Sequence, residues 1–229
     1  MPITRLPLIA AATLALAHPL AAQQPAAPAL TYADLVQLGE ASQLVLHARI
    51  RNQVALKPER APGLAAGHVR LFIEAETLSL ISGTVPVGQR FKYLVDVPLD
   101  AKGKPPKLKK AEVLLFARPV DGRPAEVQLV GPGAQQLYTA ALAERLRPVL
   151  TALVQPDAPP RVVRVADALA VEGTLVGESE TQLFLDTESD GPVSVTVVRR
   201  PGQPPRWGVS WTEIVDQSAR APAKETLAW

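Results

Sequence analysis

The chain has 229 residues, of which 47% are hydrophobic and 20% charged, so it has enough apolar material for one large or two small globular cores. It contains no cysteine, which excludes a disulfide framework and a lipid anchor attached through cysteine. The 24 Lys and Arg residues against 22 Asp and Glu residues leave a net charge of +2, which gives no overall attraction to nucleic acid or acidic polymers.

The N-terminus has the pattern of an export signal. One positive residue, Arg5, precedes an apolar stretch over residues 6–17, and small residues follow it. His18 interrupts this stretch well before the roughly 20 apolar residues that a membrane-spanning helix needs. We therefore predict a cleaved signal peptide over residues 1–22 and a flexible Pro/Ala-rich leader over residues 23–30. The mature protein is then periplasmic or secreted and has no transmembrane segment.

The sequence predicts a β-rich domain with flanking helices over residues 31–154. Thr31 with Asp34 three residues on is a capping-box pattern, which predicts a short helix after Thr31. Alternation of apolar and polar residues, with an Asp-Gly turn at Asp121, then predicts five strands. A helical period follows the strands. The predicted strands cover residues 43–56, 68–81, 90–99, 111–120 and 125–131, and the predicted helix covers 134–154.

A proline-rich linker over residues 155–160 separates this domain from a C-terminal β-rich module over residues 161–229. Residues 161–171 fit either a strand or a helix. Strands are predicted over 181–185, 192–200 and 206–211, and helix or coil over 216–229. The predicted fold class is mainly β with a few helices (α+β): a five-stranded antiparallel N-terminal module, barrel-like or a sandwich, and a smaller antiparallel C-terminal module.

Two segments, SQLVLHARI at residues 42–50 and EVLLFARP at residues 112–119, resemble strands of exported proteins that contain a small OB-like barrel. As a whole, the chain is similar to uncharacterised exported proteins of Gram-negative bacteria. The resemblance implies a barrel in the N-terminal half and a location in the cell envelope, but no activity.

Candidate catalytic residues are few. Only His47 and His68 remain after signal cleavage, and both fall on the polar faces of predicted strands. The sequence has no G-x-S-x-G motif, and no serine has a context that would activate it. If the two strands paired with the histidines side by side, Glu74 would complete a zinc site, although the spacing does not require one.

A run of lysines is the first candidate for a binding surface. Five of them lie within the nine residues from Lys102 to Lys110, with prolines between them. This run is either a solvated loop or a contact for anionic lipid or polysaccharide. Because no aromatic residue is interleaved to stack on bases, we expect no nucleic-acid partner. The binding residues proposed here are Lys104, Lys107, Lys109 and Lys110.

Two tryptophans, Trp207 and Trp211, alternate on one face of the predicted strand at residues 206–211. Core packing is one interpretation of this pair, and a platform for sugar rings or a partner protein is the other.

The stretch DTESDG at residues 186–191 matches the first half of a calcium-binding loop, with Asp186, Glu188 and Asp190 as candidate metal ligands. An EF-hand needs a bidentate glutamate at the twelfth position, which is Val197 here. We therefore predict the turn of a β-hairpin, with weak calcium binding left open, and no other cofactor.

Together these features favour an exported, soluble, non-enzymatic protein that binds an envelope protein or polysaccharide as an accessory or assembly factor. The alternatives are a hydrolase that uses carboxylates or a metal, and a carbohydrate-binding module that uses the two tryptophans.

Overall fold

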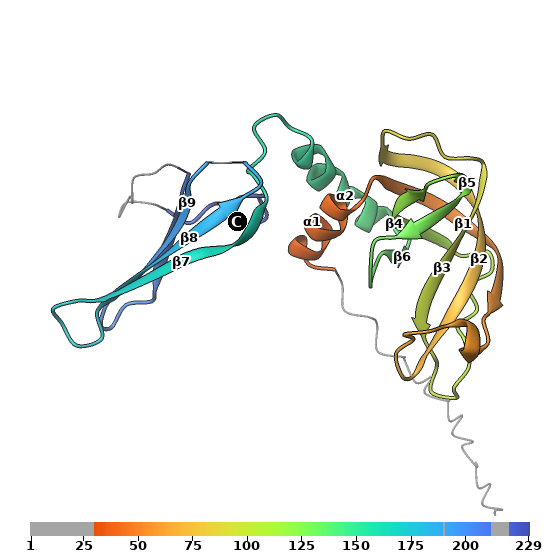
Figure 1. The fold of residues 1–229 in the computed structure, drawn as a ribbon, viewed down its shortest axis with the longest axis horizontal. Helices are drawn as coiled ribbons and strands as arrows, with labels where there is room; N and C mark the ends of the chain where they lie inside the picture. The colour runs from red at the N-terminus through yellow and green to blue at the C-terminus, as the bar shows by residue number, and fades with distance from the viewer. Residues whose placement is uncertain (1–29, 190, 212–219) are drawn as a thin grey trace, which may run out of the picture.

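In the computed structural model, the described residues are 30–189, 191–211 and 220–229. The predicted signal peptide and, except for Leu30, the predicted leader lie outside these ranges, as do Asp190 and the first part of the predicted tail. Within them the protein is mainly β, with a barrel, two α-helices and a separate four-stranded sheet (Figure 1). The predicted fold class is confirmed.

Five strands close into a barrel in the order β1-β2-β3-β5-β4-β1. Neighbouring strands are antiparallel except β3 and β5, which run parallel and share one residue pair, Lys92 with Glu126. Pairing of β1 with β4 closes the barrel. A closed five-stranded barrel is consistent with the predicted OB-like barrel. The strands are β1 (Leu44–Ala55), β2 (His68–Gly83), β3 (Arg90–Pro98), β4 (Glu112–Val120) and β5 (Arg123–Leu129).

The barrel interior is filled by the apolar half of each alternating strand. In β3 the burial alternates without a break, so that every second residue from Phe91 to Val97 is buried. The same period of two in β1 and β2 directs Ile50 and Ile73 into this interior. The interior cluster also contains Leu44, Leu46, Ala48, Leu71, Ala75, Tyr93, Val95, Val113, Leu115, Ala117 and Val127.

A second apolar core lies outside the barrel, between β4 and two helices. Residues Val113 to Ala117 are all fully buried, because β4 packs against the interior with one face and against the helices with the other. Phe116 and Leu114 point to the helix side, where they meet Leu35 of α1 (Tyr32–Ala41) and Leu146 of α2 (Ala140–Leu153).

Both helices begin at a threonine cap. Thr31 and Asp34 form the predicted capping box, with the Asp34 amide donating to the Thr31 Oγ1 at 3.2 Å. The predicted second helix starts later than expected: residues 135–137 form a short strand, β6 (Gln135–Leu137), on the free side of β4. Thr139 then caps α2 through the Leu142 amide. No helix in the described ranges has the length and apolar character needed to cross a membrane.

The C-terminal sheet is a meander of four antiparallel strands in the order β10-β9-β8-β7. The segment that fitted either a strand or a helix is the edge strand β7, and all of its residues are exposed. The strands are β7 (Val162–Glu172), β8 (Ser179–Thr187), β9 (Val193–Arg199) and β10 (Arg206–Ser210).

Candidate functional site

A groove of about 1180 Å³ lies on the barrel. It is lined by residues of β2, β3, β5 and the segment 131–135, and the β3 residues that line it include both outward ones such as Lys92 and inward ones such as Tyr93. Because β3 and β5 share only the pair Lys92 and Glu126, the two strands separate on either side of it. The groove follows from this incomplete pairing.

The groove combines apolar surface with charge. Phe72 is partly buried and Leu94 is 47% exposed, although both occupy the outward, polar positions of their strands. The Lys92 ammonium lies 5.9 Å from the centre of the Phe72 ring. Side chains of this mixed kind suit a ligand that has both apolar faces and negative groups.

One ion pair orders the groove wall. Arg70 donates from Nε to Asp96 Oδ1 at 2.6 Å and from Nη2 to Oδ2 at 2.8 Å, which is a bidentate pair. These hydrogen bonds from Arg70 lower the pKa of Asp96. Arg70 also donates to the carbonyl of Pro62, so the pair ties the β1–β2 loop to the groove.

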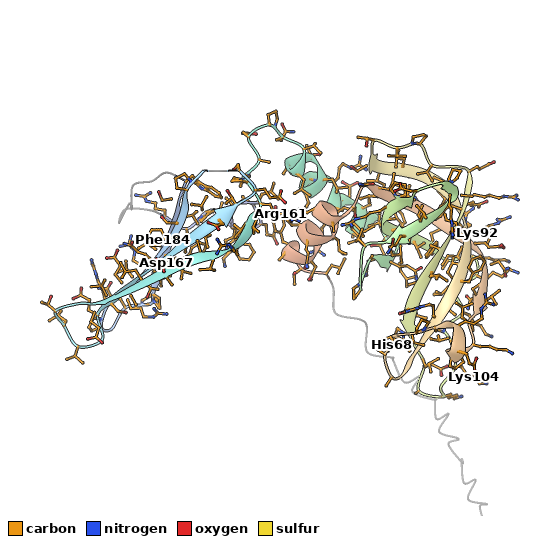
Figure 2. The ribbon with its side chains drawn as sticks, in the orientation of Figure 1. His68, Lys92, Lys104, Arg161, Asp167 and Phe184 are labelled. Carbon is orange, nitrogen blue, oxygen red and sulfur yellow. The ribbon has the colours of Figure 1, made fainter. Side chains whose placement is uncertain are left out.

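The lysine-rich run lies in the loop from residue 99 to 111, which joins β3 to β4 at one end of the barrel. The Leu99 amide donates to the Gly67 carbonyl at 2.8 Å, so this loop meets the β1–β2 loop. Figure 2 shows Lys104 and His68 at this same end. His68 lines the groove, whereas none of residues 99–111 does, so the lysine loop and the groove share an end of the barrel (Figure 2).

The loop is held by hydrogen bonds that do not use lysine side chains. Gln53 of β1 donates to the Pro106 carbonyl at 2.8 Å and accepts from the Leu108 amide at 2.5 Å. Within the described ranges, no loop lysine forms an ion pair. The four lysines predicted to bind are all exposed: Lys104, Lys107, Lys109 and Lys110.

The structure keeps the two histidines apart. His47 lies opposite Ser79 in the β1–β2 register, whereas His68 lies opposite Pro98 in the β2–β3 register. Glu74 faces Asn52. The hypothesis of a zinc site on the two histidines and Glu74 is therefore wrong. His47 pairs with Ser79, which is 11 residues along β2 from His68, so the two histidines lie far apart on the sheet.

His47 belongs instead to a polar cluster on the outer face of β1. Its Nε2 lies 2.8 Å from Glu112 Oε2, and its ring stacks on Tyr138 with centroids 3.7 Å apart. Arg49 donates to the other Glu112 oxygen at 2.7 Å. The hydrogen bonds from Arg49 and His47 lower the pKa of Glu112. His47, Arg49 and Glu112 therefore bind one another within this cluster. None of these residues lines the groove.

The predicted acidic turn joins β8 to β9. Asp186 pairs with Arg164 at 2.5 Å, and Glu188 pairs with Arg161 at 2.8 Å. Asp190 lies outside the described residues. No cluster of three acidic, histidine or cysteine side chains suited to a metal is found in the described ranges. The hairpin turn is present, and weak calcium binding stays a prediction.

The two tryptophans are at the other edge of the same sheet. Trp207 is partly buried opposite Val197 of β9, and Trp211 follows β10 with 41% of its surface exposed. The groove and these tryptophans are on different sheets. The sugar-platform interpretation of Trp207 and Trp211 stays a prediction.

Comparison with protein-family models and with curated proteins finds no match for this chain. The fold and the groove define the class: a mainly β protein with a closed five-stranded barrel, which is consistent with an OB-like barrel, and a groove lined by β2, β3 and β5.

Proposed function

We propose that this chain is a non-enzymatic binding protein of the bacterial cell envelope, and that its barrel binds an acidic polysaccharide. The observation that carries the proposal is the groove lined by β2, β3 and β5, together with an exposed lysine loop at the end of the barrel where His68 lines the groove (Figure 2). Barrels of the OB type bind oligosaccharides and oligonucleotides on the face made by their second and third strands. The groove of this chain is lined in part by β2 and β3.

The charges near the groove favour an acidic polymer. Five lysines of the β3–β4 loop face solvent, with Asp100 as the acidic residue of that loop. Clustered positive charge beside a groove attracts polyanions and speeds their association. Because no aromatic residue separates the lysines, the loop offers no stacking platform for bases, which favours polysaccharide over nucleic acid.

Isothermal titration with polygalacturonate as the acidic polymer and dextran as the uncharged one tests this proposal. Wild-type protein should bind polygalacturonate, more weakly at high salt, and should not bind dextran. Changing the four lysines to serine should weaken binding about tenfold or more, since each lysine adds attraction. The changes are Lys104→Ser, Lys107→Ser, Lys109→Ser and Lys110→Ser.

A matched control removes four positive charges from the C-terminal module and should leave the affinity within about twofold. It combines Arg199→Ser, Arg200→Ser, Arg206→Ser and Lys224→Ser, all at exposed positions. In a third variant, Phe72→Ala keeps the charge but removes the ring, and it should also weaken binding. Equal losses in the control and the loop variant, or tighter binding of single-stranded DNA than of polygalacturonate, would refute the proposed ligand.

Export is the second half of the proposal and is supported by the N-terminal pattern and the resemblance to exported proteins. Processing after Ala22 would make Gln23 the first residue of the mature protein. Mass spectrometry of protein recovered from the periplasm of an expressing Gram-negative host checks this. Recovery of the unprocessed chain from the cytoplasm alone would contradict it.

A further inference from the structure

The outer edge of β7 is open. The strand forms one rim of the C-terminal sheet and has only β8 as a neighbour in the described chain (Figure 1). A strand at the rim of a sheet presents a row of unpaired N–H and C=O groups, which is a template for another strand. β7 is longer than any other strand of its sheet, which gives this template a considerable length.

Eight of the 11 residues of this rim are apolar. Native proteins commonly protect such edges with lysine, proline or bulges; neither lysine nor proline occurs within β7, although two bulges interrupt it. Five large apolar side chains of β7 are about half exposed, and the register with β8 places Val162 and Val165 on one face of the sheet and Leu169 and Val171 on the other. The five side chains are Val162 (47%), Val163 (58%), Val165 (54%), Leu169 (51%) and Val171 (54%).

Two charges of β7 lie on the same face of the sheet. In the register with β8, Arg164 faces Asp186 and Asp167 faces Phe184. Because Ala166 is an extra, bulged residue, Arg164 and Asp167 point to the same side although they are three residues apart. Figure 2 shows Asp167 on β7 beside Phe184 of β8.

Only one of these two charges has an ionic partner in the described chain. Arg164 pairs with Asp186 at 2.5 Å. Asp167 has no cationic partner there, and its Oδ1 accepts only the amide of Ala168, at 2.8 Å. An exposed carboxylate beside an arginine on an open strand edge gives that edge two charges of opposite sign.

We propose that two copies of this chain associate through β7, whose strands pair antiparallel about a two-fold axis at Val165. Such an axis stands perpendicular to the sheet and keeps each face of the sheet on its own side. Because Ala166 is an extra, bulged residue in each copy, the residue opposite Arg164 of one copy is then Asp167 of the other. Arg164 then lies between Asp186 of its own chain and Asp167 of the second copy. In this arrangement β7 supplies the open backbone edge and the two opposite charges on each side of the interface. This self-complementarity favours a second copy over an unrelated partner.

Sedimentation velocity and light scattering of the purified protein over a range of concentrations test this interface. Wild-type protein should show twice the mass of the chain at high concentration. Asp167→Arg places two arginines opposite each other, and Arg164→Asp places two aspartates opposite each other. Either change alone should weaken self-association about tenfold or more.

The two variants should associate with each other when mixed. In the mixed pair, Arg164 of the first variant meets Asp167 of the second, and the new arginine meets the new aspartate. Mixing therefore distinguishes loss of the interface from loss of folding. Arg147→Asp, an equal charge reversal on the exposed face of α2, is the matched control and should leave self-association unchanged.

A monomeric wild-type protein at all concentrations would overturn the proposal. So would dimerisation that both reversals leave intact, because another surface would then hold the copies together. Failure of the mixed variants to associate, with each folded by circular dichroism, would overturn the register with Arg164 opposite Asp167.

Discussion

Phe116→Ala should lower the free energy of unfolding by about 3 to 5 kcal/mol. Phe116 has no exposed surface and lies between β4 and the two helices, in contact with a cluster that includes Leu35 and Leu146. Its truncation would leave a cavity that neither the hydrogen-bonded strand nor the helices can fill without moving. Urea denaturation followed by circular dichroism measures the change.

The matched control is Leu80→Ala on β2. Leu80 is 44% exposed, so its truncation removes less buried surface and should lower stability by less than about 1 kcal/mol. Equal losses for Phe116→Ala and Leu80→Ala would show that α1 and α2 do not pack firmly over β4.

Gly83→Ala should lower the free energy of unfolding by about 2 kcal/mol or more. Gly83 ends β2 opposite Leu44 with φ of 148°, a backbone conformation that favours glycine. A Cβ atom there would lie 2.9 Å from the Gln43 carbonyl oxygen and 2.9 Å from Leu44 Cδ2. Gln43 cannot move freely, because its amide donates to the Ala117 carbonyl at 3.0 Å where the barrel closes.

Gly131→Ala provides the comparison for this substitution. A Cβ atom at Gly131 would have no neighbour within 4 Å, and its φ is outside the region that favours glycine. We expect the change at Gly131 to alter stability by less than about 0.5 kcal/mol. Thermal melting of both variants checks the pair, and equal melting temperatures would contradict the close contact at Gly83.

The strands of the barrel could be predicted because their alternation reflects a single buried face. β3 is the clearest case, since each apolar residue from Phe91 to Val97 faces the interior. The start of α2 could not be predicted in the same way. Residues 135–137 fit the helical period, but β4 leaves an edge free beside them, and pairing with that edge overrides local preference. The segment of β7 fitted both states because its β-branched residues favour a strand, while the spacing of Val163, Asp167 and Val171 also suits a helix. In the structure, two bulges disturb the period of two in this strand.

The candidate site was predicted in part. The lysines are visible in the sequence as a charge run, and the structure places them in a loop at the end of the barrel where His68 lines the groove (Figure 2). The groove could not be predicted, because it depends on how far β3 and β5 separate after the barrel closes. One signal was available: Phe72 and Leu94 are apolar residues at positions where their strands are otherwise polar. The spacing of His47 and His68 in the sequence did not indicate that the two side chains lie far apart on the barrel.

The two sheets differ in how their strands follow one another along the chain. Every pair in the C-terminal sheet joins strands that are consecutive in the sequence, whereas the barrel closes by joining Leu44 to Ala117. Bringing distant segments together costs more chain entropy and slows folding. The C-terminal meander can therefore form from local contacts, while barrel closure waits for β4. Before β4 pairs with β1, the backbone edge of β1 on that side has no partner strand and is available to other chains.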